Sequence, residues 1–194
     1  MNKYGDDYFI EVCKGLKESV ATDKAGIVDM DSALEKWAMR ARETQQNGGL
    51  VFFCGNGASC TMAEHMSHDW FQNAKVNTYT CSETSHITAI SNDVSYEDVF
   101  SYRIDRILSK NDMLVTISSS GNSPNIVKAI KTAQSKGAFV VTLSGMKSDN
   151  KSRMMGDLNF YVPLPTYGTV ESGHAVLLHT ALDLFLDKYQ GGRH

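Results

Sequence analysis

The sequence lacks any apolar run long enough to cross a membrane. Its longest apolar stretches, Leu50 to Cys54 and Ala175 to Leu178, are far shorter than the roughly 20 residues that span a bilayer. The opening segment MNKYGDDYF carries acidic residues where a signal peptide has a basic region and an apolar run. We therefore expect a cytoplasmic protein without a membrane partner.

Positive charge is also scarce. The chain has 19 Lys and Arg residues against 22 Asp and Glu residues, which gives a net charge of -3. Proteins that bind the backbone of nucleic acids usually carry clustered Lys and Arg. Direct binding of nucleic acid is therefore not expected.

Cysteine and proline are rare. The 194 residues contain only four cysteines, with no CxxC pair among them, which is too few for a disulfide framework: Cys13, Cys54, Cys60 and Cys81. We interpret them as free thiols. Because only three prolines and no low-complexity stretch interrupt the chain, no linker is visible, and the sequence predicts one domain over residues 1–194.

The sequence does contain a regular alternation of short β-rich runs and helical segments from Gly49 onward, which is typical of a parallel sheet covered by helices. The predicted strands are 50–54, 76–79, 113–117, 139–143 and 158–162. Apolar residues recur at helical spacing from Phe9 to Val20 and from Ile27 to Ala41, which predicts two helices in segment 1–48. The predicted fold class is α/β, a three-layer α/β/α sandwich around a parallel five-stranded sheet, with N-terminal helices.

The last predicted helix, which ends at about residue 186, has almost no polar face. Its apolar residues are Val176, Leu177, Leu178, Ala181, Leu182, Leu184 and Phe185. A helix that is apolar all round must be buried. In a chain of this size that burial requires other subunits as well as the sheet, so we expect a homo-oligomer.

Two loops between a predicted strand and a predicted helix are suited to an anion. In GNGAS, residues 55–59, backbone N–H groups and a helix N-terminus converge, although a simple tight turn is an equal interpretation. Cys60 replaces the third glycine of a dinucleotide fingerprint, and no GK[ST] follows as in a P-loop. The second loop is SSSGNSP, residues 118–124. Ser123 and Gly121 are explained as a helix cap and a turn residue, but three consecutive serines are not, and their hydroxyls suit a phosphate monoester.

Ligand-type side chains gather on two predicted helices. His65 and Asp69 are four residues apart and project from one face, a spacing that more often gives a surface hydrogen bond than a metal site. Their position directly after a predicted phosphate loop favours a functional role. The final helix carries Glu171, His174 and His179 in apolar surroundings, where ionisable groups are costly without partners.

The segments CGNGAS, the helix with His65, SND at 91–93 and ISSSGNSPNIVKAI resemble the successive motifs of the phosphoheptose isomerase branch of the sugar isomerase (SIS) domain family. The resemblance extends from about residue 49 to 186 and implies the flavodoxin-like SIS fold and a tetramer in which segment 1–48 packs between subunits. It also implies the residues that bind the phosphorylated sugar: Asn56, Gly57, Ala58, Ser59, Asn92, Asp93, Ser118, Ser119, Ser120, Ser123 and Glu171.

The resemblance further implies one zinc ion per subunit. His68 and His174 are less favoured as ligands of this ion. The implied ligands are His65, Asp69, Glu171 and His179. Asp69 and His179 would also be the general base and the general acid. Glu171 and His179 are eight residues apart, about 12 Å of rise on a regular helix. Either the segment before Gly173 is not regular helix, or different subunits contribute ligands.

Several positions depart from the pattern of the isomerases. Asp69 replaces a glutamate and Glu171 replaces a glutamine, while Gly168, Thr169 and Asn73 replace charged residues. The function implied is an aldose–ketose isomerase that converts sedoheptulose 7-phosphate to D-glycero-D-manno-heptose 7-phosphate for surface polysaccharide synthesis. The alternatives are a non-catalytic scaffold that resembles the replication-initiator-associating proteins, and an isomerase of another sugar phosphate.

Overall fold

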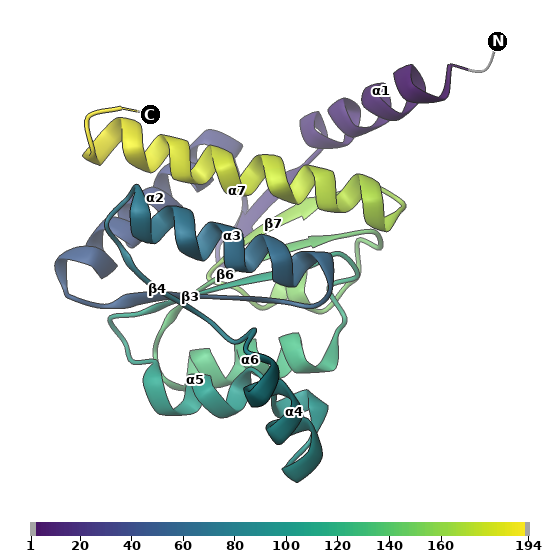
Figure 1. Ribbon diagram of the computed structural model, residues 1–194. Coiled ribbons are helices and arrows are strands. Elements are labelled where there is room, and N and C mark those ends of the chain that lie inside the picture. Colours follow the sequence, from purple (N-terminus) through teal and green to yellow (C-terminus); the bar gives the residue numbers. More distant parts are fainter. Residues whose placement is uncertain (1–2, 193–194) are drawn as a thin grey trace.

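The structure, a computed structural model, describes residues 3–192 and places a sheet between two layers of helices (Figure 1). The strands lie in the order β2-β1-β7-β6-β5-β3-β4. Their bounds are β1 (Val20–Asp23), β2 (Gly26–Val28), β3 (Leu50–Gly55), β4 (Asn77–Thr80), β5 (Met113–Ser118), β6 (Phe139–Gly145) and β7 (Leu158–Val162). The helices are α1 (Tyr4–Lys17), α2 (Met30–Gln46), α3 (Ala58–Gln72), α4 (Thr84–Asp93), α5 (Ser101–Ile107), α6 (Pro124–Ser135) and α7 (Tyr167–Tyr189), with short 3-10 turns at Tyr96–Asp98 and Ser152–Met154.

All five predicted strands are present, and β3 to β7 pair in parallel. The prediction of a five-stranded, wholly parallel sheet was wrong, because β1 and β2 form a hairpin that pairs antiparallel with β7. The hairpin lies inside the segment that was predicted to be helical. Its turn is fixed by Asp23, whose Oδ1 accepts from the backbone N–H of Ala25, and by Gly26 at a φ of +129°. The apolar residues at its two ends matched a helical period by chance.

The two faces of the sheet carry separate hydrophobic clusters. Helices α2, α3 and α7 cover one face, and α4, α5 and α6 cover the other (Figure 1). On the first face Trp37 packs against Phe160 with ring centroids 5.4 Å apart, and Trp70 packs against Phe185 at 5.1 Å. The first of these buried aromatic pairs holds α2 against β7, and the second holds α3 against α7.

Helix α1 projects away from the sandwich (Figure 1). Tyr4, Phe9 and Ile10 are 73, 67 and 65% exposed, and Gly15 is the buried residue of this helix. None of the helices within residues 3–192 has the length and apolar character needed to cross a membrane.

The order of the strands determines where a ligand can enter. From β3 the chain moves to β4 on one side, and it then returns to the other side of β3 to form β5. At such a switch point the loops that follow the two neighbouring strands diverge and leave a crevice at the carboxyl edge of the sheet. The two loops predicted to bind phosphate follow β3 and β5, and they therefore flank this crevice.

Candidate active site

The loop after β3 turns sharply into α3 because two of its residues have no side chain. A Cβ on Gly55 would lie 2.6 Å from the backbone carbonyl of Ser59, and Gly57 has a φ of +57°. Both positions therefore require glycine, and the turn brings the first backbone N–H groups of α3 to the crevice. The two interpretations of residues 55–59, a tight turn and an anion-binding loop, therefore describe one and the same structure.

The loop after β5 leaves hydroxyl groups free. Ser123 is the N-cap residue of α6, but its side chain makes no capping hydrogen bond. Gly121 has a φ of +62°, and a Cβ there would lie 2.0 Å from Oδ1 of Asn150. Close packing against Asn150 thus holds the loop, while Ser123 lines the cavity between the two loops.

A pair of asparagines joins the two loops. Asn56 Nδ2 donates to Asn125 Oδ1 at 3.0 Å, and Asn125 Nδ2 donates to Asn56 Oδ1 at 2.9 Å. The hydroxyl of Tyr96 also donates to Asn56 Oδ1 at 3.1 Å. Asn125 was not among the predicted site residues, although its place directly after the serine motif was a signal. The brace fixes the spacing of the two loops.

The loops enclose a cavity of about 160 Å³, which we call the serine cavity. It is lined by Asn56, Ser59, Ile117, Ser118, Ser119, Ser120, Ser123, Tyr167 and Glu171. These residues include the starts of α3, α6 and α7, so three helix N-termini point at one small volume. Their partial positive charges favour an anion. No Lys or Arg within residues 3–192 lines the cavity, so uncharged donors supply its anion-binding character.

Six of the serines and asparagines predicted to bind substrate line this cavity, together with Glu171; they are Asn56, Ser59, Ser118, Ser119, Ser120 and Ser123. Tyr167 was not predicted, because it belongs to no motif in the sequence. Gly57 and Ala58 lie in the adjoining turn and are not in the lining. Asn92 and Asp93 lie at the end of α4, exposed, where Asn92 donates to Asp93 at 2.8 Å. The fold of one chain does not bring them to the cavity.

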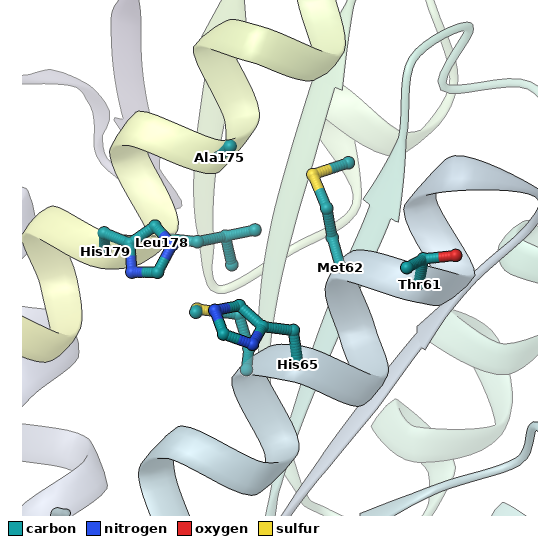
Figure 2. Close-up of a pocket in the computed structure, with 7 residues that line it drawn as sticks. Thr61, Met62, His65, Ala175, Leu178 and His179 are labelled. Carbon is teal, nitrogen blue, oxygen red and sulfur yellow. The ribbon is translucent and has the colours of Figure 1, made fainter.

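A second cavity, of about 210 Å³, opens between α3 and α7, and we call it the histidine cavity. Its lining is Thr61, Met62, His65, Met66, Ala175, Leu178 and His179 (Figure 2). The rings of His65 and His179 meet in an edge-to-face arrangement between the two helices, with centroids 5.4 Å apart. His65 Nε2 lies 3.3 Å from Asp69 Oδ2.

Ligand atoms of His65, Asp69 and His179 all lie within 4.8 Å of one another. Two imidazole nitrogens and one carboxylate oxygen are a donor set that transition metals accept, and three protein ligands leave a position open for a small molecule. The side chain of Asp69 is only 19% exposed, so its charge lies partly out of solvent. The residues present therefore fit a metal ion.

Glu171 does not lie with these three residues. Helix α7 is continuous from Tyr167 to Tyr189, so the explanation that the segment before Gly173 is irregular was wrong. On a regular helix Glu171 and His179 are separated by about 12 Å of rise. Glu171 lines the serine cavity instead, and its part in metal binding stays a prediction that would require ligands from more than one subunit.

The start of α7 also explains one departure from the isomerase pattern. Thr169 is 1% exposed and forms a capping box with Thr166, whose Oγ1 accepts from the backbone N–H of Thr169 at 3.3 Å. Thr169 therefore starts the helix and faces inward. A hydroxyl used in this way is not free to contact a substrate.

His174 lies between the two cavities along α7 and has no exposed surface. The polar group beside its ring within residues 3–192 is the backbone of Ser144. Burial lowers the pKa of His174 from 6.5 to about 4, against a smaller opposing effect of the Ser144 backbone. The imidazole is therefore neutral at physiological pH.

Comparison with known proteins identifies relatives of the chain. The model of the SIS domain matches residues 16–145. The phosphoheptose isomerases of Aliarcobacter butzleri and Proteus mirabilis are both 33% identical to the chain, over 79% and 78% of its length and 84% and 82% of theirs. The structure of phosphoheptose isomerase from Neisseria gonorrhoeae superposes with a TM-score of 0.81 at 26% identity and covers 94% of this chain and 98% of that one. A phosphoheptose isomerase from Francisella tularensis, at 21% identity, shares the fold with a TM-score of 0.82.

Proposed function

Since the chain belongs to the SIS domain family and to its phosphoheptose isomerase branch, we propose that it is an aldose–ketose isomerase. Its substrate would be sedoheptulose 7-phosphate, and its product D-glycero-D-manno-heptose 7-phosphate, a precursor of surface polysaccharide. The observation that carries the proposal is the alignment of the serine cavity and the histidine cavity along one pair of helices.

The distance between the two cavities suits the length of the substrate. The histidine cavity lies between α3 and α7, which pack side by side, and the serine cavity lies near the N-terminal ends of the same two helices (Figure 1). Along α7, Glu171 in the serine cavity and His179 in the histidine cavity are about 12 Å apart by helical rise. An opened seven-carbon chain with carbon–carbon bonds of about 1.5 Å spans a comparable length with its phosphate. The phosphate would occupy the serine cavity while C1 and C2 reach the histidines.

Binding at the phosphate end would orient the reacting carbons. Ser120, Ser123 and the backbone N–H groups of three helix N-termini would donate to the phosphate oxygens. Because these donors are held by the asparagine brace and by glycine turns, their positions are set before the ligand arrives. The binding energy of the remote phosphate can then hold C1 and C2 beside the acid and the base.

Proton transfer would use Asp69 and His179. One side chain would remove the proton from C1 or C2 and the other would protonate the neighbouring position or its oxygen, which passes the substrate through an enediol. His65, Asp69 and His179, with Glu171 as the implied fourth ligand, would hold a zinc ion, one per subunit. When bound, zinc supplies Lewis acidity that stabilises negative charge on a substrate oxygen.

We also propose the oligomeric state of the protein and its location in the cell. The exposed apolar residues of α1, namely Tyr4, Phe9 and Ile10, support packing of the N-terminal segment between subunits of a homotetramer. Light scattering tests this, and a fully active monomer would contradict it. A single domain, a cytoplasmic location and the absence of nucleic-acid and membrane partners complete the proposal.

One observation favours an isomerase of another sugar phosphate as the second candidate. The carboxylate of Glu171 lines the serine cavity, and Thr169 is buried in the helix cap, so two positions that would contact substrate have changed chemistry. A scaffold without catalysis is less well supported, because ligand-type side chains still converge at His65, Asp69 and His179.

Incubation with sedoheptulose 7-phosphate in D₂O tests all three functions. The proposed enzyme should form the aldose phosphate and exchange hydrogen at C1 or C2. An isomerase of another sugar phosphate should give neither change with this substrate and both with its own. A scaffold should bind sugar phosphates without exchange of any of them, which would contradict the proposal.

A further inference from the structure

Asn125 is a buried polar side chain at the start of α6 to which the proposed reaction gives no part. It is 2% exposed and follows Pro124, the first residue of the helix. Its Oδ1 accepts from Asn56 Nδ2 at 3.0 Å and from the backbone N–H of Ile126 at 2.9 Å. Its Nδ2 donates to Asn56 Oδ1 at 2.9 Å. Three hydrogen bonds therefore hold this buried amide in one orientation.

The bond to Ile126 does the work of a helix cap. Ser123 is the N-cap residue of α6, where a serine hydroxyl normally accepts from the N–H of the second or third helical residue. Ile126 is that third residue, and its N–H is bonded to Asn125 instead. Ser123 makes no side-chain capping bond and lines the serine cavity. The helix thus has its cap at this N–H without the hydroxyl of Ser123.

The same amide fixes which end of Asn56 faces a ligand. The backbone N–H of Ile126 can only donate, so the atom of Asn125 that it meets is Oδ1 and the other is Nδ2. Because Nδ2 can only donate, it must meet Oδ1 of Asn56. The hydroxyl of Tyr96 donates to the same oxygen at 3.1 Å, and the two donors use both of its lone pairs. Since Asn56 lines the serine cavity, the amide group that it can offer there is the second N–H of Nδ2.

We propose that Asn125 is a positioning residue for two anion-binding donors of the serine cavity. By capping α6 at Ile126, it leaves the hydroxyl of Ser123 free to donate to the anion. By its paired bonds to Asn56, it turns the remaining amide N–H of Asn56 to the same ligand. Both donors are uncharged, in keeping with a cavity that no Lys or Arg within residues 3–192 lines. The inference rests on the proposed binding of a phosphate in this cavity.

Ser123→Ala, made in two backgrounds of the oligomeric protein purified without chelators, tests the capping role. In the wild type it should weaken the binding of inorganic phosphate about tenfold in calorimetry, as expected for loss of one hydrogen bond to a charged group. The melting temperature should not change, because Ser123 is not the cap. In Asn125→Leu the N–H of Ile126 loses its acceptor, and Ser123 should turn to cap the helix. There Ser123→Ala should leave phosphate affinity unchanged and lower the melting temperature by about 2–4 °C.

Two other asparagine variants provide the comparison and the control. Asn125→Asp keeps an acceptor for the N–H of the helix, and the effect of its charge on phosphate cancels when affinities with and without Ser123→Ala are compared. In this background Ser123→Ala should again cost about tenfold in affinity and nothing in melting temperature. Asn122→Ala controls for a loosened loop, because the Asn122 side chain bonds to backbone groups of Ser120 and Lys151 but does not line the cavity. It should bind phosphate as the wild type does.

Unchanged phosphate binding in Asn125→Leu would overturn the inference. An equal loss of affinity from Ser123→Ala in the wild type and in Asn125→Leu would overturn it too, and so would weak binding in Asn122→Ala. If Asn125→Leu does not fold, Ser123→Ala in the wild type decides, since a lower melting temperature there would show that Ser123 already caps α6. Phosphate binding that follows this pattern without conversion of sedoheptulose 7-phosphate would refute the proposed function and leave the role of Asn125 intact.

Discussion

Protonation of His174 should destabilise the fold between pH 6.5 and pH 4. In the folded protein burial lowers its pKa from 6.5 to about 4, so in this interval the unfolded chain binds a proton that the folded chain does not. Stability therefore rises with pH across the window and is lost as pH falls through it. The two pKa values differ by about 2.5 pKa units, and at about 1.4 kcal/mol per unit the loss is roughly 3 kcal/mol when the pH falls below 4.

Urea denaturation from pH 7.5 to pH 4, followed by circular dichroism, measures this effect. His174→Leu removes the titration, and the difference in unfolding free energy between the wild type and this variant isolates it from the other ionisable groups. The protein should be treated with a chelator, so that release of a bound metal at low pH does not contribute to the measured change. Parallel stability curves for wild type and variant would refute the reasoning, because they would mean that His174 titrates equally in both states.

Four further changes test the site. Asp69→Asn should retain sugar-phosphate binding and lose turnover by roughly 10²- to 10⁴-fold, the range of general-base catalysis, in a deuterium-exchange assay of protein with verified metal content. His65→Ala should lose bound metal by elemental analysis, and full occupancy would show that the triad is the wrong cluster. Ser120→Ala should weaken the binding of phosphorylated ligands by about 1.5–3 kcal/mol, measured by calorimetry, without lowering the melting temperature of the protein. Gly121→Ala should lower the melting temperature, because Gly121 has a φ of +62° and the added Cβ would clash with Asn150. An unchanged melting temperature would contradict this.

The parallel part of the fold could be predicted because its signals are local. Each predicted strand is a short apolar run, and all five correspond to β3 to β7 within a few residues. The hairpin of β1 and β2 could not be predicted in this way. Val20 and Ile27 also fit a helical period. What makes their segments strands is the pairing of β2 with β1 and of β1 with β7, which follows about 140 residues later in the chain.

The candidate site shows the same division. Residues on the two loops and the pair His65 and Asp69 were predicted because each set is close in sequence. Asn125, whose bonds to Asn56 cross between loops, and Tyr167, which reaches the serine cavity from α7, depend on how distant segments pack. Asn92 and Asp93 remain a prediction that the fold of one chain does not support, since a second subunit would have to bring them to a substrate.

Two of the departures from the isomerase pattern can be understood together through the geometry of α3 and α7. The shorter side chain of Asp69 keeps its carboxylate near the helix, where it lies 3.3 Å from His65. Glu171, two turns before His179, places a carboxylate in the serine cavity, whose other lining residues are neutral. A phosphate dianion beside the carboxylate of Glu171 would be repelled unless a cation lies between them. The substitution of glutamate for glutamine is therefore compatible with phosphate binding only if a metal or a basic side chain of another subunit reaches this end of α7. Because of the negative charge of Glu171, we expect phosphate binding itself, and not only turnover, to require a metal or the oligomer.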